Sequence, residues 1–190
     1  MATTADPRIV PFAIGLDRYE LMVERGVLGE DDHVELLKGV LSEMTPQGDA
    51  HSTLVEWLAE ELTIHARAGE YSVRPQLPLR LPPASMPEPD LALVRRRPPG
   101  RHGHPEHAWL AIEISVTSQA TDLGVKAELY AAAGIDELWV VDVPVRTVHV
   151  HRTPTAAGYT DVSPVTAGEL RCSIPGAPAI DVGALFGVLD

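Results

Sequence analysis

The amino-acid sequence predicts an α/β fold in which a central mixed β-sheet is flanked by helices. Residues 109–142, WLAIEISVTSQATDLGVKAELYAAAGIDELWVVD, contain two apolar strands separated by a polar loop and a helix. A strand–helix–strand unit of this kind joins parallel strands. On either side of it, short extended segments punctuated by turn residues predict hairpins and therefore antiparallel neighbours. Both strand orientations are thus expected in one sheet.

The length and composition fit one soluble globular domain spanning residues 1–190, with residues 1–12 as a loosely ordered arm. The hydrophobic content is 45% and the charged content 22%, which argues against a disordered chain. A single cysteine excludes an intrachain disulfide and a thiolate zinc cluster. The net charge of −12 disfavours non-specific binding to nucleic acid. No apolar run is long enough to span a membrane, so the expected location is the cytoplasm.

An N-terminal helix and a β-hairpin are expected as additions to the core. Residues 16–26, LDRYELMVERG, place apolar side chains among charges and end at Gly26, a suitable helix C-cap. Residues 34–46, VELLKGVLSEMTP, predict two short strands joined by a two-residue turn at Lys38 and Gly39.

The first core elements follow this hairpin. Residues 51–69, HSTLVEWLAEELTIHARAG, repeat apolar side chains at helical spacing, and Asp49 is expected to cap this helix. Residues 71–83, YSVRPQLPLRLPP, alternate and carry several prolines, as expected of an edge strand. Residues 87–94, PEPDLALV, predict a short apolar strand, and residues 95–107, RRRPPGRHGHPEH, predict a loop.

The C-terminal part is expected to complete the same domain. Residues 145–153, VRTVHVHRT, and residues 159–173, YTDVSPVTAGELRCS, each predict an outer strand. Residues 174–190, IPGAPAIDVGALFGVLD, predict a turn and a short closing helix.

Two carboxylates and a lysine are the candidates for chemistry. Glu113 stands inside an apolar strand, where a carboxylate is costly unless a cation compensates it. Asp90 begins another apolar strand, and antiparallel pairing of the two strands would bring the carboxylates together. Two carboxylates with water and a phosphate oxygen suit Mg²⁺, which can activate water and stabilise the charge that develops on a phosphodiester. Lys126, on the following helix, can orient that water or stabilise the transition state.

The residues that carry these features resemble the Uma-type putative restriction endonucleases, a bacterial branch of the PD-(D/E)xK, restriction-endonuclease-like superfamily. The resemblance runs from about Leu16 to the C-terminus and includes VELLKGVLSEMTP, His51 and PEPDLALV. Its densest part is residues 110–143, LAIEISVTSQATDLGVKAELYAAAGIDELWVVDV, in which E, D, K, Y, AGI, W and VD stand in register. It implies a restriction-endonuclease-like core and a nuclease that uses Mg²⁺ or Mn²⁺.

The resemblance also implies roles for individual residues. Asp90 and Glu113 occupy the two metal-binding carboxylate positions, and Glu35 falls where the family carries an additional acidic residue. The lysine of the superfamily usually stands two residues after the glutamate, where this chain has Ser115. Lys126 is then the lysine that has moved to the helix. In two further departures, Val116 and Leu123 replace polar or charged residues.

Simpler interpretations exist for the principal carboxylates. Glu113 can form an internal salt bridge with Lys126 or Arg80, without catalysis. Asp90 follows a proline and can be a turn residue whose side chain bonds the backbone. Glu35 can equally be a solvated strand charge.

For two helical residues the simple interpretation is favoured. Asp122 is interpreted first as the N-cap of its helix, although it stands four residues before Lys126 and can pair with it. His51 is interpreted as an ordinary polar residue of a first helical turn, with a position at the edge of the site as the alternative.

A basic cluster follows the strand that begins at Asp90. It comprises Arg95, Arg96, Arg97 and Arg101, which can contact nucleic-acid phosphates or belong to a solvated loop. The sequence therefore predicts a Mg²⁺-dependent endonuclease that acts on nucleic acid, DNA being the expected substrate, and that can form a homodimer. The alternative is a catalytically inactive member of the fold that serves as a dimeric interaction or regulatory protein.

Overall fold

A computed structural model describes residues 10–66, 70–98, 100 and 102–190 of the chain. Six strands form its central sheet: β3 (Tyr71–Pro75), β4 (Leu91–Arg95), β5 (Leu110–Ser115), β6 (Glu137–Asp142), β7 (Thr147–Thr155) and β8 (Gly158–Val165). They lie in the order β3-β4-β5-β6-β7-β8, and all neighbours are antiparallel except β5 and β6, which are parallel. The predicted mixed sheet is confirmed, including the antiparallel pairing of β4 with β5 and the edge position of β3.

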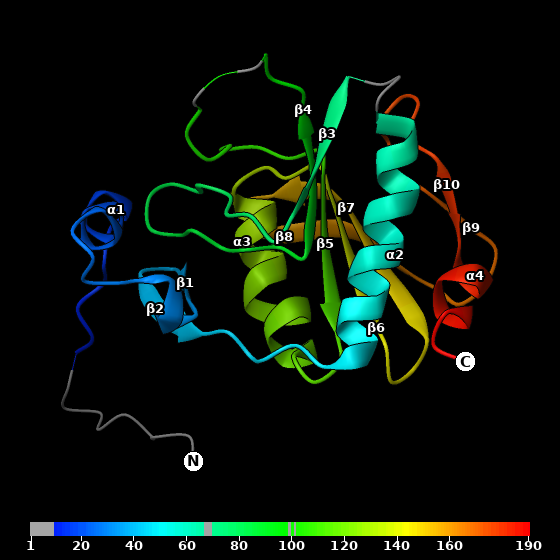
Figure 1. Cartoon of the computed structure of the whole chain (residues 1–190), viewed down its shortest axis with the longest axis horizontal. Helices are drawn as coiled ribbons and strands as arrows, with labels where there is room; N and C mark the ends of the chain where they lie inside the picture. Colours follow the sequence, from blue (N-terminus) through cyan, green and yellow to red (C-terminus); the bar gives the residue numbers. More distant parts are fainter. Residues whose placement is uncertain (1–9, 67–69, 99, 101) are drawn as a thin grey trace.

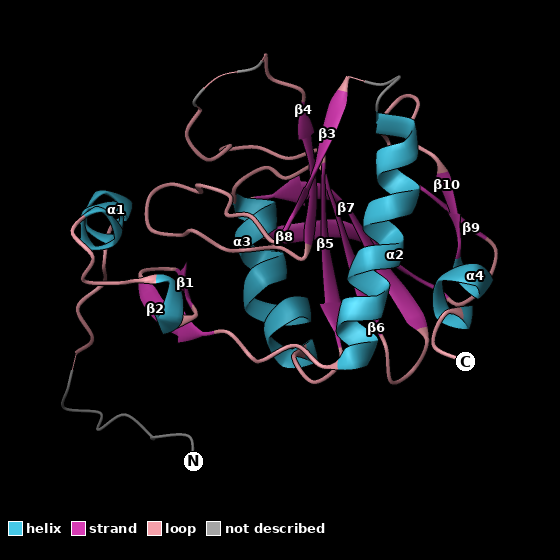
Figure 2. Cartoon of the chain, in the orientation of Figure 1, coloured by secondary structure: helices cyan, strands magenta, loops and turns pink. Residues whose placement is uncertain are grey.

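Helices cover both faces of this sheet (Figures 1 and 2). Helix α2 (Asp49–Ala66) and helix α4 (Val182–Gly187) pack on one face, and helix α3 (Ala127–Ala132) packs on the other. Alternation along each strand separates the two cores. Ile112 and Trp139 point towards α2, whereas Ala111 and Val140 point towards Tyr130 of α3.

The N-terminal additions lie at the left of the core in Figure 1. Helix α1 (Leu16–Glu24) precedes a 3-10 turn, η1 (Glu30–Asp32), and the hairpin of β1 (Val34–Leu37) and β2 (Val40–Glu43). Lys38 and Gly39 have positive φ angles of 49° and 82°, as a tight hairpin turn requires. Leu36 joins this hairpin to the core segment before β4 through a bridge with Met86. The predicted helix and hairpin are confirmed.

Three details differ from the sequence-based expectations. Helix α2 begins at Asp49 itself, so this residue belongs to the first turn. The segment expected as one strand over residues 159–173 breaks at Gly168, where φ is 84°. Its second part is a separate strand, β9 (Glu169–Arg171), which pairs with β10 (Ala179–Asp181).

The N-terminal arm is described only in part, because residues 1–9 lie outside the described residues. Val10 and Phe12 are exposed. None of the described helices has the length and apolar character needed to cross a membrane.

Candidate active site

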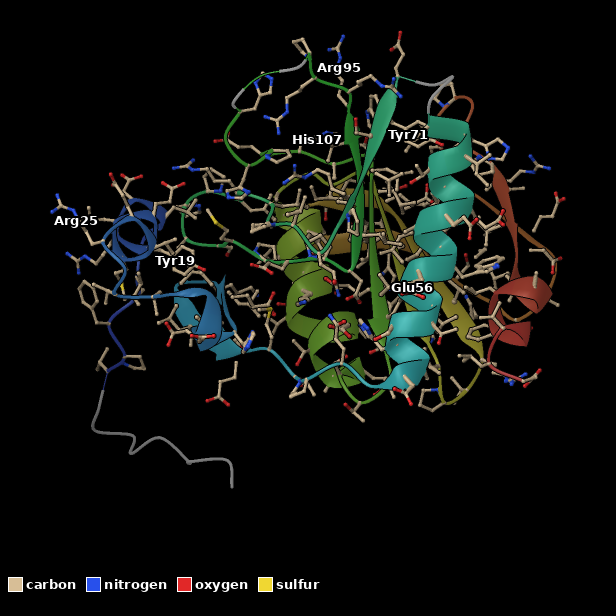
Figure 3. All side chains as sticks on the ribbon, in the orientation of Figure 1. Tyr19, Arg25, Glu56, Tyr71, Arg95 and His107 are labelled. Atoms are coloured by element: carbon tan, nitrogen blue, oxygen red, sulfur yellow. The ribbon has the colours of Figure 1, made fainter. Side chains whose placement is uncertain are left out.

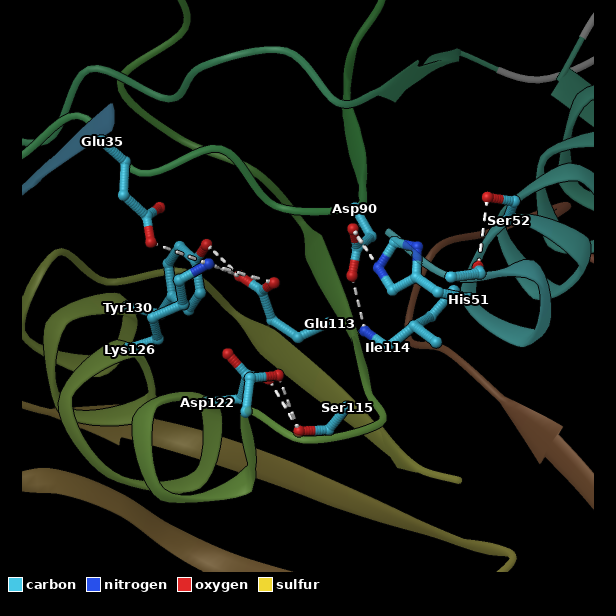
Figure 4. A network of polar contacts seen from close by, with 12 residues as sticks. Glu35, His51, Ser52, Asp90, Glu113, Ile114, Ser115, Asp122, Lys126 and Tyr130 are labelled. Carbon is cyan, nitrogen blue, oxygen red and sulfur yellow. Dashed lines mark hydrogen bonds and ion pairs between the residues drawn. The ribbon is translucent and has the colours of Figure 1, made fainter. Parts of the chain in front are cut away.

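Asp90 and Glu113 meet where β4 begins and β5 ends. Leu91 pairs with Ile112 in the antiparallel register, so the next pair along the two strands is Asp90 with Glu113. Directly opposed side chains lie on the same face of a sheet, with Cβ atoms about 5 Å apart. The backbone N–H of Ile114 donates to Oδ2 of Asp90 at 2.7 Å, which fixes this carboxylate against β5 (Figure 4). The convergence expected from antiparallel pairing is present.

Lys126 enters the same place from the helical segment behind the sheet. Its Nζ lies 3.3 Å from both carboxylate oxygens of Glu113 and 3.3 Å from Oε1 of Glu35 (Figure 4). All three side chains are buried. Glu35 is therefore not a solvated strand charge, because the β1–β2 hairpin carries it into the site.

The charge of Lys126 is fixed by its surroundings. Burial by itself would lower the pKa of Lys126, but Glu113 and Glu35, with smaller contributions from Asp122 and Asp90, raise it above its ordinary value. Lys126 is therefore protonated at neutral pH. It can donate hydrogen bonds and stabilise negative charge, and it cannot accept a proton from water.

Glu113 is held between Lys126 and a tyrosine. The hydroxyl of Tyr130 donates to Oε1 of Glu113 at 2.6 Å. Burial raises the pKa of Glu113 well above its ordinary value, Lys126 opposes the rise, and the carboxylates of Asp90, Asp122 and Glu35 add to it. Burial and the charge of Glu113 likewise raise the pKa of Tyr130, so its phenol stays protonated. Tyr130 packs in the core of the α3 face, and through its hydroxyl it also orients Glu113.

His51 lies at the edge of the site, which was the alternative interpretation of this residue. Its Nε2 lies 2.9 Å from Oδ1 of Asp90, because the N-terminal end of α2 reaches the sheet edge at this point (Figure 4). The favoured interpretation of His51 as an ordinary first-turn residue is wrong. Its Nδ1 is buried and has no hydrogen-bond partner in the described part of the chain.

Asp122 is not an N-cap, which corrects the favoured interpretation. The backbone N–H of Asp122 bonds the carbonyl of Ser118, so the helix begins earlier than expected. The carboxylate of Asp122 accepts hydrogen bonds from the hydroxyls of Ser115, at 2.7 Å, and Ser118. Ser115, in the strand position where the superfamily usually has lysine, therefore serves to hold Asp122. Lys126 pairs with Glu113 and Glu35 instead of Asp122.

The segment that carries Asp122 and Lys126 has an unusual helical form. Residues 121–126, element η2 (Thr121–Lys126), form a π-helix that continues directly into α3. Such π segments are rare and occur often at functional sites. Both charged side chains of η2 are buried against the sheet, and the sequence pattern gave no sign of this form.

Negative charge exceeds positive charge at the site. Glu35, Asp90, Glu113 and Asp122 are buried carboxylates, and Lys126 is the buried ammonium among them. Glu88 adds a half-buried carboxylate whose pKa is raised by burial and by Glu35. A divalent cation would offset this excess, because several uncompensated carboxylates are costly to bury together.

The oxygen donors of this site suit Mg²⁺ better than they suit a metal ion whose ligands all come from the protein. Within residues 10–66, 70–98, 100 and 102–190, no group of three or more His, Cys, Asp or Glu side chains is arranged to hold a metal ion. Mg²⁺ keeps several waters and is usually bound by one or two carboxylates plus substrate phosphate. Asp90 and Glu113 meet that requirement, since a carboxylate retains acceptor capacity after two hydrogen bonds.

The arginine cluster does not lie beside Asp90. Arg95 ends β4, at the opposite end of the strand from Asp90, and Figure 3 shows it at the top of the molecule. Arg96 donates to the carbonyls of Ala66 and Tyr71, and so fastens the end of α2 to β3. Arg95 and Arg96 therefore lie away from Asp90, and contact of these arginines with nucleic acid remains a prediction. Arg101 lies outside the described residues.

Comparisons with known proteins agree with this architecture. A sequence profile of the Uma2 family, described as "Putative restriction endonuclease", matches residues 16–180. The chain is also similar to the crystal structure of a putative nuclease belonging to DUF820 from Anabaena variabilis ATCC 29413. The two share 19% sequence identity, with a TM-score of 0.73 over 93% of this chain and 99% of the other. No curated protein matches the chain. The predicted family and fold are confirmed.

Proposed function

The chain belongs to the Uma2 family of putative restriction endonucleases, and on that premise we propose that it is a Mg²⁺-dependent endonuclease. It would hydrolyse phosphodiester bonds of nucleic acid, DNA being the expected substrate and Mn²⁺ an alternative ion. The observation that carries the proposal is the convergence of Asp90, Glu113 and Lys126 from three separate elements. Three ionisable groups buried together in this way are more typical of a functional site than of a stabilising core.

Asp90 and Glu113 would hold the metal ion, with Glu35 as an additional acidic group. A bound Mg²⁺ lowers the pKa of water and stabilises negative charge on a phosphoryl oxygen. His51 and Ile114 orient Asp90, and Tyr130 orients Glu113, so both carboxylates are positioned before substrate arrives.

Lys126 contributes a fixed positive charge. Each of its contacts with the carboxylates measures 3.3 Å, longer than the roughly 2.8 Å of a strong charge-assisted hydrogen bond. Lys126 is thus shared between Glu35 and Glu113 and not saturated by either. An oxygen of the phosphodiester, or the attacking water, can take part of its donor capacity, and Lys126 stabilises charge there without accepting a proton.

A second candidate function is an inactive member of the fold that acts as a dimeric interaction or regulatory protein. One observation favours it: Lys126 and Tyr130 already occupy both oxygens of Glu113, as in a stabilising core network. The net charge of −12 is also unfavourable for binding nucleic acid.

Cleavage and metal binding together separate the two candidates. Supercoiled plasmid, single-stranded DNA and RNA are incubated with millimolar Mg²⁺, Mn²⁺ or EDTA. We expect metal-dependent cleavage of at least one substrate, reduced about 100-fold or more in Asp90→Asn and in Lys126→Ala. Asp161→Asn, at an exposed aspartate of β8, is the matched control and should keep full activity.

Thermal unfolding gives an independent readout. Mg²⁺ should raise the melting temperature of the wild type and leave that of Asp90→Asn unchanged. At 100 times its dissociation constant, the ion should stabilise the folded wild type by about 2.7 kcal/mol. Cleavage that survives in Lys126→Ala would indicate a contaminant. Absence of both cleavage and any metal-induced shift would favour the interaction protein.

A further inference from the structure

The described lysines and arginines divide into two groups by their partners. Those paired with a carboxylate are Lys38, Arg80, Lys126, Arg146, Arg152 and Arg171. Six have no carboxylate partner among the described residues: Arg18 of α1 and Arg25 at its C-terminal end, and four that gather on β3 and at the end of β4, namely Arg74, Arg95, Arg96 and Arg97. In a chain with 27 acidic residues against 15 basic ones, this gathering of unpaired arginines is unexpected.

Two of the four have simple roles. Arg96 bonds the carbonyls of Ala66 and Tyr71 and stabilises the junction between α2 and β3. Arg95 is exposed at the end of β4 (Figure 3). Neither needs a ligand to explain its position.

Arg74 and Arg97 are different because both reach the surroundings of the loop residue His104: Arg97 bonds the carbonyl of its neighbour Gly103, and Arg74 bonds the carbonyl of Pro78, which His104 also contacts. Burial, followed by the charge of Arg97, lowers the pKa of Arg74. Burial and then the charge of Arg74 lower the pKa of His104, against an opposing contribution from the Glu20 carboxylate, so the neutral imidazole is favoured. The two guanidinium groups form a positively charged cluster, here called the Arg74–Arg97 cluster.

The hydrogen bonds of the two guanidinium groups are incomplete. Arg74 donates to the carbonyl of Pro78 at a long 3.4 Å, and its buried Nε has no partner in the described part of the chain. Arg97 donates to the carbonyl of Gly103 at 2.9 Å. A guanidinium has five donors, so most of this capacity remains available. An unsatisfied buried donor in a positive environment calls for an acceptor that carries negative charge.

We propose that the Arg74–Arg97 cluster is a subsite that binds a backbone phosphate of the nucleic acid, away from the bond that is cut. The inference rests on the proposed nuclease function. Guanidinium groups bind phosphate oxygens through paired, charge-assisted hydrogen bonds, which fits the free donors of both arginines. The subsite would also offset the unfavourable net charge of the chain by concentrating positive charge along one path.

The position of Arg74 gives the direction of that path. Arg74 pairs with Ala92 across β3 and β4, so its side chain lies on the same face of the sheet as Asp90. Two residues of strand separate Ala92 from Asp90, about 7 Å along β4. The bound nucleic acid would therefore run from the Asp90–Glu113 position along β4, on this face of the sheet.

The salt dependence of binding tests the subsite. Binding of fluorescently labelled single- and double-stranded DNA is measured by anisotropy over a series of NaCl concentrations, with Ca²⁺ in place of Mg²⁺ to limit cleavage. Loss of one phosphate contact should reduce the slope of log K against log salt concentration by about 0.7–0.9. We expect this change in Arg74→Gln and in Arg97→Gln, with affinity about five- to tenfold lower near 0.1 M salt.

Matched variants make the result specific. Arg171→Gln removes an exposed arginine that is paired with Glu169 on β9, and it should keep the wild-type slope. Arg74→Lys and Arg97→Lys should retain the slope and lose part of the affinity, because lysine keeps the charge without the paired donors. A wild-type slope in the Arg74→Gln/Arg97→Gln double variant, or no DNA binding by the wild type, would overturn the subsite.

The subsite and the nuclease function fail in different ways. The Mg²⁺-induced thermal shift depends on Asp90 and should be unchanged in the arginine variants. A normal shift and normal cleavage with an unaltered salt slope would reject the subsite alone. An arginine-dependent slope without any metal-dependent cleavage would support the subsite and reject the nuclease.

Discussion

Two buried glutamates on the neighbouring parallel strands β5 and β6 have opposite surroundings. Glu137, where β6 begins, accepts hydrogen bonds from Trp139, Arg152, and the backbone and hydroxyl of Ser173. Its negative charge is paired with a guanidinium, and both oxygens are satisfied at 2.7–3.1 Å. Glu137 thereby fastens β6 to β7 and to the C-terminal segment.

Glu113 has fewer donors and more repulsion. Lys126 lies 3.3 Å away and is shared with Glu35, while Asp90, Asp122 and Glu35 all raise the pKa of Glu113. The exposed fractions of Glu113 and Glu137 are almost equal, at 2% and 1%. Burial of a carboxylate therefore does not distinguish a structural role from a functional one. The number of hydrogen-bond donors around it, weighed against the number of neighbouring negative charges, does distinguish them.

The largest expected difference between the two glutamates is in activity. Glu113→Gln removes a charge that would bind the proposed metal ion and should reduce phosphodiester cleavage by about 1,000-fold. Glu137→Gln keeps the shape of a residue that begins β6, three residues before the position that pairs with Glu113, and should stay within about threefold of the wild type, since it touches no reacting group. Initial rates of plasmid nicking, measured well below both melting temperatures, give the comparison. Equal losses in the two variants would show that Glu113 acts through stability.

For the free energy of unfolding, substitution of Glu137 should have the larger effect and substitution of Glu113 the smaller. Glu137→Ala leaves the indole N–H of Trp139 and the Ser173 groups without their acceptor, and should lower the free energy of unfolding by about 2–4 kcal/mol. Glu113→Gln should change it by less than about 1 kcal/mol without metal, because repulsion from neighbouring carboxylates is relieved as the ion pair is lost. Urea unfolding at constant m-value provides both numbers. Glu169→Ala, which breaks an exposed pair with Arg171, is the control, with an expected change of at most about 0.5 kcal/mol.

The sequence contains the signal of a buried carboxylate twice but distinguishes the two only through other residues. Both LAIEIS and ELWVVD place a glutamate in an apolar strand. Glu113 could be distinguished by its expected neighbours Asp90 and Lys126. The pairing of adjacent strands and the packing of a connecting helix back onto the sheet are rules that can be applied without coordinates. The mixed sheet, the β4–β5 pairing and the turn at Lys38 were predictable for the same reason.

The rest of the site depends on packing between elements distant in sequence. His51 reaches Asp90 through the packing of α2 on the sheet, which spacing along the chain does not encode. Glu35 enters through the way the hairpin docks near Met86. Asp122 lies inside the helix, because the helical segment begins before the π-helix, and its carboxylate bonds the hydroxyls of Ser115 and Ser118. Arg95, Arg96 and Arg97 lie at the far end of β4, and the length of that strand separates them from Asp90.

The smallest expected effect is a pH dependence of the free energy of unfolding. It arises from Glu113, so Glu137→Gln should leave it intact. The folded-state pKa of Glu113 is raised above its unfolded value, so its neutral form is favoured by folding. Its contribution to stability is present below the unfolded pKa of about 4.5 and is lost as pH rises through the folded pKa. Urea unfolding of the metal-free protein between pH 4.5 and 8 should therefore show a decline that Glu113→Gln removes. Mg²⁺ should also reduce the decline in the wild type, because it binds the ionised carboxylate. A Glu113→Gln variant that retains the full decline would assign it to another group and remove the distinction between the two glutamates.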